Sequence, residues 1–123
     1  MKKRILIIED EPAFAKMVKL RLQSAGFDVS IAADAYHGIM EVLKGNPDLV
    51  VLDLKMPAGG GFGILERMRG VPSKAMLPVV ILTGIIIDAG TRAKAEAYDV
   101  AAVFTKPYES KQFISKIRSL ISA

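Results

Sequence analysis

The sequence alternates between short apolar runs and longer segments whose apolar residues recur at helical spacing. The apolar runs are typical of β-strands and occupy 4–8, 28–32, 48–54, 78–83 and 101–105. Helical segments are expected after these runs, at 12–26, 35–46, 62–70, 88–98 and 110–122. Because the runs lack alternating polar residues, we expect a parallel sheet with both faces covered by helices. The sequence therefore predicts one α/β domain over residues 1–123, with five strands and five helices.

Composition fits one soluble domain and excludes several kinds of chemistry. With 123 residues, of which 51% are hydrophobic, the chain can bury a core. It contains no cysteine, which excludes disulfides, cysteine–zinc sites and thiolate catalysis and fits a cytoplasmic location. The net charge is +4, but no helix carries a dense basic stripe, so we expect no direct nucleic-acid binding. The longest nearly apolar run, 77–87, is too short and too interrupted to cross a membrane.

Polar side chains follow several of the predicted strands at the point where each strand ends. Glu9 and Asp10 follow the first strand, and Asp53 lies near the end of the third. Thr83 ends the fourth strand, and Lys106 follows the fifth. Ligands of open parallel sheets bind beyond the carboxyl ends of the strands, so these side chains should meet at one edge. Each has an ordinary explanation by itself, as a helix cap, a strand end or a solvated lysine, but the combination favours a site.

Three carboxylates at one edge of a sheet repel one another and require positive charge between them. Lys106 supplies one charge, and a divalent cation would supply the rest. Oxygen ligands without histidine or cysteine suit Mg²⁺. A metal ion, a lysine and a hydroxyl could each take one oxygen of a phosphoryl group, with the Asp53 carboxylate as nucleophile. This set of residues therefore indicates phosphoryl transfer that forms an acyl phosphate.

Four segments at these strand ends resemble the motifs of a known family. They are IEDEP at 8–12, LDLKMP at 52–57, VVILTG at 79–84 and FTKP at 104–107. In this order and spacing they resemble the receiver domain of bacterial two-component response regulators, and the resemblance covers essentially the whole chain. It implies a flavodoxin-like parallel sheet in the strand order 2-1-3-4-5, with helices on both faces.

The resemblance implies a phosphoacceptor that takes a phosphoryl group from a sensor histidine kinase or a histidine phosphotransfer protein. Phosphorylation of Asp53 would switch the loop after Thr83 and the face formed by the fourth and fifth strands with their helices. An unidentified downstream protein would dock on that face. A member of this family is not an enzyme toward other substrates, because it catalyses only its own phosphorylation and dephosphorylation.

The resemblance also assigns residues to a Mg²⁺ site. Asp10 and Asp53 correspond to direct metal ligands, and Glu9 corresponds to a ligand that acts through water. The backbone carbonyl of Lys55 corresponds to the remaining protein ligand. Glu9, Asp10 and Asp53 are also the carboxylates that the residues themselves indicate, whereas the Lys55 carbonyl is implied by the resemblance alone.

Three further residues complete the site that the resemblance implies. Lys106 corresponds to the lysine that holds a phosphoryl oxygen, and Thr83 corresponds to the hydroxyl that moves onto the phosphoryl group. Pro107 corresponds to a proline with a cis peptide bond that directs the lysine.

The chain departs from the family pattern at three places near the fifth strand. Val103 stands where the family usually has a tyrosine or phenylalanine switch, and the neighbouring Phe104 should point to the other face of the sheet. Asp99 replaces a glycine, which should weaken the left-handed stop of the preceding helix. Ala101 and Ala102 replace an acidic pair that supports one common mode of dimerisation in the family, so we do not expect that dimer. We also expect a monomer in the unphosphorylated state.

Several other features carry weaker expectations. Lys55 places a cation beside the path of attacking water and predicts slow self-dephosphorylation. Of the three isoleucines at 85–87, one or two should pack under the following helix, or the group could form a hydrophobic docking spot. The run AGGGFG at 58–63 lacks a following Gly-Lys-Ser/Thr and predicts a flexible turn, not a nucleotide loop. His37 should lie on the surface.

Three other classes of protein could carry some of these residues on a similar fold. A haloacid-dehalogenase-type phosphatase would need an aspartate where the chain has Lys55, and a flavodoxin-like flavin binder would be repelled by the acidic loop after the first strand. A phosphorylation-independent interaction module with a receiver fold should have lost Asp53 or Lys106, and both are present. This interaction module remains the alternative to the phosphoacceptor.

Overall fold

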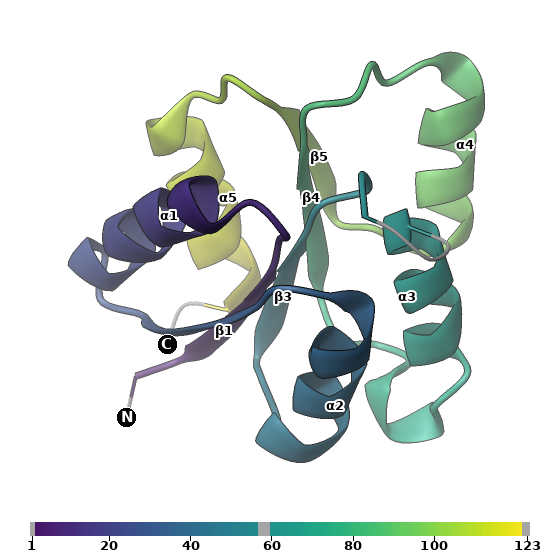
Figure 1. The fold of residues 1–123 in the computed structure, drawn as a ribbon, viewed down its shortest axis with the longest axis horizontal. Coiled ribbons are helices and arrows are strands. Elements are labelled where there is room, and N and C mark those ends of the chain that lie inside the picture. Colours follow the sequence, from purple (N-terminus) through teal and green to yellow (C-terminus); the bar gives the residue numbers. More distant parts are fainter. Residues whose placement is uncertain (1, 57–59, 122–123) are drawn as a thin grey trace.

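A five-stranded parallel sheet runs through the middle of the molecule, in the order β2-β1-β3-β4-β5 (Figure 1). The computed structural model describes residues 2–56 and 60–121. The strands are β1 (Arg4–Ile8), β2 (Asp28–Ala32), β3 (Leu49–Leu52), β4 (Val79–Thr83) and β5 (Ala102–Thr105). The helices are α1 (Pro12–Ser24), α2 (Ala35–Gly45), α3 (Gly60–Arg69), α4 (Ala89–Ala97) and α5 (Ser110–Ile121), with a short 3₁₀ helix η1 (Pro72–Lys74).

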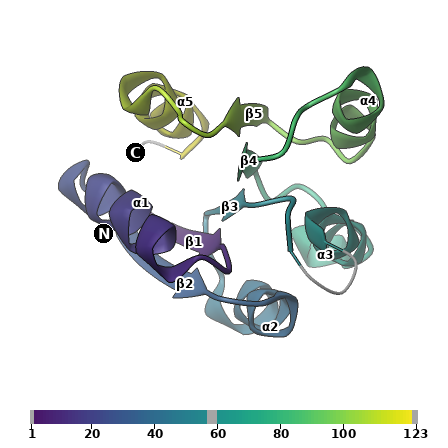
Figure 2. The ribbon, with the colours of Figure 1, turned by 45° about the horizontal axis from the view of Figure 1, so that its top comes forward.

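The helices form two layers on opposite faces of this sheet. Helices α1 and α5 lie side by side on one face, and α2, α3 and α4 cover the other, as Figures 1 and 2 both show. All four pairs of neighbouring strands are parallel. The α/β fold, the strand order and the helices on both faces are therefore confirmed.

The strands are apolar throughout because each of their faces packs against a helical layer. Along β1, Ile5 and Ile7 belong to the core cluster under α1 and α5, whereas Leu6 and Ile8 belong to the cluster under α2, α3 and α4. All four side chains are at most 2% exposed. This alternation between two buried faces explains the absence of period-two polarity in the sequence.

The glycine run before α3 is part of the packing between that helix and β3. A Cβ atom at Gly61 would lie 2.6 Å from the backbone oxygen of Asp53, a distance that side chains do not tolerate. The expectation of a flexible turn is therefore wrong for Gly60 and Gly61, which already belong to α3. Residues 58 and 59 of the same run lie outside the described part of the chain. The helix begins two residues before the predicted Phe62 because glycine allows this close approach.

The turn after α4 keeps a left-handed residue although glycine is absent there. Asp99 has φ +57°, so the conformation expected of a glycine is present at an aspartate. The Arg69 side chain donates hydrogen bonds to the carbonyl oxygens of Tyr98, at 2.8 Å, and of Asp99, at 3.4 Å. These contacts hold the end of α4 against α3.

Candidate functional site

Three carboxylates meet at the carboxyl ends of β1 and β3. Glu9 follows β1 directly and Asp53 follows β3 directly, and these two strands are neighbours in the sheet. Oxygen atoms of Glu9, Asp10 and Asp53 lie within 4.8 Å of one another. Glu9 and Asp53 are each only 3% exposed, whereas Asp10 is exposed. Carboxylates this close, two of them buried, fit the ligand set of a hard divalent cation such as Mg²⁺.

The Lys106 ammonium places a positive charge next to two of these carboxylates. It donates a hydrogen bond to Oε1 of Glu9 at 2.9 Å, and it lies 3.6 Å from Oδ2 of Asp53. The pKa of the Glu9 carboxyl lies above its usual value, chiefly because of burial and also because of the Asp53 charge, although hydrogen bonds from Lys106 and the Glu11 backbone lower it in part. Burial lowers the pKa of Lys106, but the hydrogen bond to Glu9 and the charges of the surrounding carboxylates together outweigh it, so the pKa lies above its usual value.

Hydrogen bonds fix the Asp53 carboxylate in one orientation. Its Oδ1 accepts a hydrogen bond from the Thr83 hydroxyl at 2.6 Å and another from the backbone N–H of Lys55 at 3.1 Å. Thr83 is fully buried at the end of β4, and its Oγ1 also accepts from the backbone N–H of Ile85 at 3.4 Å. The carboxylate is therefore connected directly to the first residues of the β4–α4 loop.

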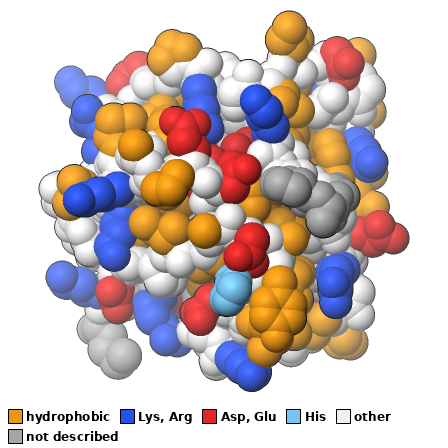
Figure 3. Space-filling view, viewed as in Figure 1, with side chains coloured by type: hydrophobic (Ala, Val, Ile, Leu, Met, Phe, Trp, Pro, Cys, Tyr) orange, Lys and Arg blue, Asp and Glu red, His pale blue; other side chains and the backbone are white. Residues whose placement is uncertain are grey.

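Every residue predicted for the site lies in this one region. One open depression is lined by Glu9, Asp10, Asp53, Lys55 and Lys106, and Thr83 lies beneath it in contact with Asp53. Figure 3, viewed as Figure 1, shows acidic side chains next to basic ones in the upper middle of this face. The Lys106–Pro107 peptide bond is cis, as predicted. Pro57, the last residue of the LDLKMP segment, lies outside the described residues.

Comparison with known proteins identifies the family. A family model described as "Response regulator receiver domain" matches residues 5–118. The chain belongs to this family. The receiver domain is 34% identical over 120 residues to the DNA-binding dual master transcriptional regulator RpaA of Synechocystis sp., covering 96% of this chain and 48% of that protein. It is 33% identical to the transcriptional regulatory protein TrcR of Mycobacterium tuberculosis, covering 96% of this chain and 45% of that protein.

Solved structures agree with this assignment. The signal receiver domain of a DNA-binding response regulator from Colwellia psychrerythraea superposes with a TM-score of 0.86 at 29% identity, covering 99% of this chain and 100% of that one. The chemotaxis protein CheY4 of Vibrio cholerae has a TM-score of 0.90 at 21% identity, covering 98% of this chain and 100% of that one, and shows the shared fold. The receiver domain spans about half the length of the curated relatives described above.

The fifth strand of this receiver domain separates its valine and its phenylalanine as predicted. Val103 packs against the core cluster under α2, α3 and α4. Phe104 packs against the cluster on the other face, where its ring meets the ring of Phe113 at 5.5 Å between centroids. No aromatic side chain therefore stands at position 103, and Phe104 cannot take its place because it lies across the sheet.

Of the three isoleucines after Thr83, two pack inward and one projects outward. Ile85 and Ile87 are half-buried against the core cluster under α2, α3 and α4. Ile86 is 88% exposed. The expectation that one or two of them pack is confirmed, and it leaves Ile86 as the single apolar side chain of the three that faces solvent.

Phe14 contacts a residue of the site, although the sequence alone does not indicate that contact. The ring of Phe14, in the first turn of α1, lies under the Lys106 ammonium with 4.0 Å between the nitrogen and the ring centroid. Helical spacing marks Phe14 only as a residue that faces the core. Its contact with a lysine from the opposite end of the chain depends on the tertiary fold.

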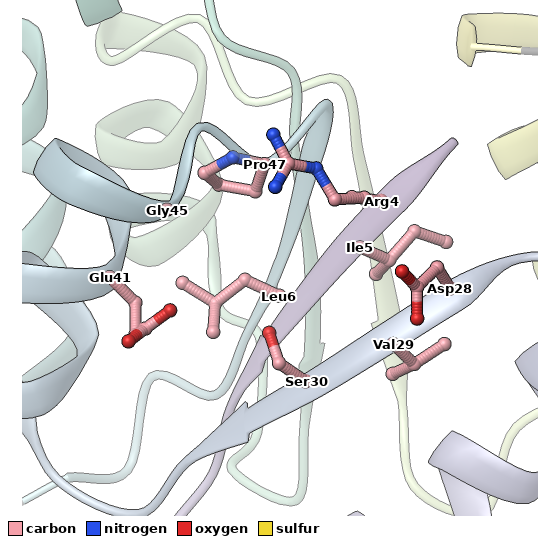
Figure 4. A pocket seen from close by; sticks show the side chains of 9 residues that line it. All are labelled: Arg4, Ile5, Leu6, Asp28, Val29, Ser30, Glu41, Gly45 and Pro47. Atoms are coloured by element: carbon pink, nitrogen blue, oxygen red, sulfur yellow. The ribbon is translucent and has the colours of Figure 1, made fainter. Parts of the chain in front are cut away.

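A second, smaller pocket lies at the opposite end of the strands (Figure 4). Arg4 and Asp28 begin β1 and β2 there, and Glu41 reaches toward it from α2. Figure 4 shows Leu6 and Ser30 between these charged side chains. The charges in this pocket are of both signs, and Arg4 already donates a hydrogen bond to the carbonyl oxygen of Asn46, so the pocket presents no convergent site.

Histidine is absent from the site. His37 is exposed in the first turn of α2, where its backbone N–H and its ring nitrogen both contact the Asp34 carboxylate at 2.8 Å. This confirms that His37 is a surface residue.

None of the helices in the described part of the chain combines the length and apolar composition that a bilayer crossing requires.

Proposed function

We propose that the chain is a phosphoacceptor of a two-component or phosphorelay system, in which Asp53 receives a phosphoryl group from a histidine kinase or a histidine phosphotransfer protein. The observation that carries this proposal is the environment of the Asp53 carboxylate. Thr83 and the Lys55 N–H hold Oδ1, while Oδ2 faces the Lys106 ammonium. A carboxylate held in one orientation beside a cation and a hydroxyl is suited to act as a nucleophile toward phosphorus.

In this reaction, an oxygen of Asp53 forms a bond to phosphorus while the bond from phosphorus to the donor's histidine nitrogen breaks. The nitrogen keeps the electron pair, and the product on this chain is an acyl phosphate. Lys106 lies close enough to pair with one phosphoryl oxygen, and the Thr83 hydroxyl can donate to another. Asp10, Asp53, the Lys55 carbonyl and, through water, Glu9 would hold Mg²⁺, which supplies positive charge against the phosphoryl oxygens.

Phosphorylation would change the β4–α4 loop through Thr83. In the unphosphorylated state the Thr83 hydroxyl donates to Asp53 and accepts from the Ile85 N–H. A shift of this hydroxyl toward a phosphoryl oxygen would therefore alter the loop that carries Ile86 and the β4–α4–β5–α5 face, where a downstream protein would dock. We further propose a cytoplasmic location, a monomer before phosphorylation and no direct contact with nucleic acid.

The test is intact-mass measurement after incubation with acetyl phosphate. We expect the wild-type chain to gain one phosphoryl group in the presence of Mg²⁺ and none when EDTA is present. Asp53→Asn should gain none, whereas the control Asp28→Asn, which changes an exposed carboxylate at the far end of β2, should behave as wild type. A folded wild-type chain that gains nothing with Mg²⁺ would contradict the proposal and favour the phosphorylation-independent interaction module.

Lys55 is expected to prolong the life of the phosphoryl group. Its side chain is exposed, and the residue lines the same depression as Asp53. A cation there would screen or engage the phosphoryl group, so Lys55→Ala should speed dephosphorylation by about threefold to tenfold, the effect of roughly 1 kcal/mol on the barrier. The decay of the phosphorylated mass after removal of acetyl phosphate measures this rate. Lys44→Ala, at an exposed lysine in the last turn of α2, is the control, and an unchanged lifetime in Lys55→Ala would refute the role.

Ile86 is expected to act in docking and not in folding. Because it is 88% exposed, Ile86→Ser should change the free energy of unfolding by less than about 0.5 kcal/mol. Ile87→Ser should cost more than about 1 kcal/mol, because Ile87 packs against the core. Urea denaturation measures the free energy of unfolding of both variants.

The role of Ile86 in docking is tested by binding. Ile86→Ser should weaken binding of the phosphorylated chain to its downstream protein, and unchanged binding would argue against that role.

A further inference from the structure

The Lys106 ammonium is held between a carboxylate and an aromatic ring. It donates to Glu9 at 2.9 Å on one side, and the face of the Phe14 ring lies 4.0 Å away on another. Phe14 is half-buried at the start of α1, just beyond the acidic residues that follow β1. A ring face attracts a cation electrostatically, and it does so more strongly where water is partly excluded. The ring therefore limits where the ammonium can rest, which an aliphatic side chain of similar size would not do.

Phe14 is also the first member of a chain of aromatic rings, which consists of Phe14, Tyr108, Phe113 and Phe104. The ring centroids of Phe14 and Tyr108 are 6.1 Å apart, and those of Tyr108 and Phe113 are 5.1 Å apart, both with edge-to-face geometry. Phe113 then meets Phe104 at 5.5 Å. These contacts connect the start of α1 with the loop before α5, with α5 itself and with β5. The ring chain lies on the face of the sheet opposite Val103.

The Tyr108 hydroxyl has an unusual environment within this ring chain. It is buried and has no hydrogen-bond partner among the residues that the structure describes. A buried hydroxyl without a partner is unfavourable, so a small movement that gives it one would be favoured. Tyr108 follows Lys106 by two residues, so a displacement of the lysine backbone or of the Phe14 ring acts on it directly.

From these contacts we infer that Phe14 is a positioning residue that holds the Lys106 ammonium for phosphoryl transfer, and that the ring chain carries the lysine's displacement to α5. The inference rests on the proposed phosphoacceptor function. A phosphoryl group on Asp53 would add an oxygen partner for the ammonium, which lies 3.6 Å from that carboxylate and now bonds to Glu9. As the ammonium moves, the Phe14 face loses its cation, and the edge contact with Tyr108 changes with it. Val103 cannot supply an aromatic switch, and the ring chain provides one on the other face of the sheet.

The positioning role is tested with three variants whose phosphorylation rates are measured by intact mass with acetyl phosphate and Mg²⁺. Phe14→Leu keeps apolar volume but removes the ring face, and it should slow phosphorylation about threefold to tenfold. Phe14→Tyr keeps the ring face and should remain within about twofold of wild type. Phe27→Leu, a buried phenylalanine of the same core cluster that is not in the ring chain, is the control for lost packing. Equal slowing in Phe14→Leu and Phe27→Leu, or no slowing in Phe14→Leu, would overturn the role.

A second measurement reports the geometry and does not depend on the reaction rate. In spectra of the chain labelled with ¹³C at lysine Cε, the ring should shift the Lys106 proton resonance upfield from those of exposed lysines. This shift should disappear in Phe14→Leu and persist in Phe14→Tyr. A Lys106 resonance that does not respond to Phe14→Leu would show that the ring does not hold the ammonium.

The relay of the Lys106 displacement to α5 is tested by replacing tyrosine with 3-fluorotyrosine throughout the chain. The chain has three tyrosines, Tyr36, Tyr98 and Tyr108, so the ¹⁹F spectrum contains three resonances. Phosphorylation should shift the ¹⁹F resonance of Tyr108, assigned with Tyr108→Phe, and leave that of the exposed Tyr36 unchanged. Phosphorylated Phe14→Leu should lose the Tyr108 shift. If phosphorylation leaves the Tyr108 resonance of the wild-type chain unchanged, or shifts it equally in Phe14→Leu, the relay is contradicted and the proposed phosphoacceptor function is not. A wild-type chain that gains no phosphoryl group would contradict the proposed function and the inference with it.

Discussion

Replacement of Lys106 by methionine is expected to lower the free energy of unfolding by about 3 kcal/mol at neutral pH without metal, because it leaves two buried carboxylates without their cation. Glu9 and Asp53 are each 3% exposed, and the ammonium lies 2.9 Å from the first and 3.6 Å from the second. A methionine fills similar space but offers no charge and no hydrogen bond. The loss should therefore exceed that of most surface substitutions, and urea denaturation in EDTA measures it.

The effect of Lys106→Met should depend on pH in a defined direction. Burial already raises the folded-state pKa of Glu9 above its usual 4.5, and loss of the Lys106 hydrogen bond raises it further. Because the folded variant then binds a proton more readily than the unfolded chain, its stability rises as pH falls from neutral toward 4.5. On the alkaline side, the wild-type chain should lose the Lys106 contribution as pH rises above 10.5, since the folded-state pKa of Lys106 lies above that value.

Two controls make the Lys106 prediction specific. Lys111→Met changes an exposed lysine in the first turn of α5 and should alter stability by less than about 0.5 kcal/mol. Lys106→Arg keeps a positive charge and should recover part of the loss. A Lys106→Met chain as stable as wild type at neutral pH, or one whose stability does not rise on acidification, would contradict the electrostatic description of the site.

Arg69→Met should lower the free energy of unfolding by about 2–3 kcal/mol, because one guanidinium satisfies carbonyl oxygens from three segments. Its Nε donates to the Tyr98 carbonyl at 2.8 Å, and its Nη1 donates to the Leu77 carbonyl at 2.9 Å. Longer contacts at 3.4 Å reach the carbonyls of Lys74 and Asp99. These groups lie at the end of α4, in η1 and before β4, so the substitution leaves partly buried acceptors unpaired at each place.

Comparison with a neighbouring arginine separates this role from charge alone. Arg67→Met removes an exposed arginine from the same helix and should change stability by less than about 0.5 kcal/mol. Arg69→Lys should recover little, because a single ammonium cannot reach all of these carbonyls with the geometry of a guanidinium. Equal losses in Arg67→Met and Arg69→Met would show that Arg69 does not act through these hydrogen bonds.

The fold and most of the site could be predicted because both depend on local patterns. Apolar runs without alternating polarity occur in strands that are buried on both faces, and the order of segments then fixes an α/β sheet. Glu9, Asp53 and Thr83 each lie at or directly after the end of a strand, and parallel strands bring such ends to one edge. Element ends were predicted less well, as at Gly60, because the start of α3 depends on how closely it approaches β3.

Contacts that depend on tertiary packing could not be predicted. Phe14 meets Lys106 only because α1 and the loop after β5 lie side by side, and helical spacing marks Phe14 as no more than a core residue. Arg69 has the sequence context of an ordinary basic residue in the last turn of a helix, yet it bonds to the end of α4. The short helix η1 was missed because three residues are too few for a periodic signal.

The most direct test of Asp53 as the phosphoacceptor is to locate the phosphoryl group. Incubation with acetyl phosphate and Mg²⁺, reduction with borohydride and tandem mass spectrometry of peptides would convert an aspartyl phosphate into homoserine and identify its position. We predict homoserine at position 53 in the wild-type chain and none at Asp10, Asp28 or Asp48. Homoserine at another aspartate, or none at all from a folded chain carrying Mg²⁺, would contradict the assignment of Asp53 as the nucleophile.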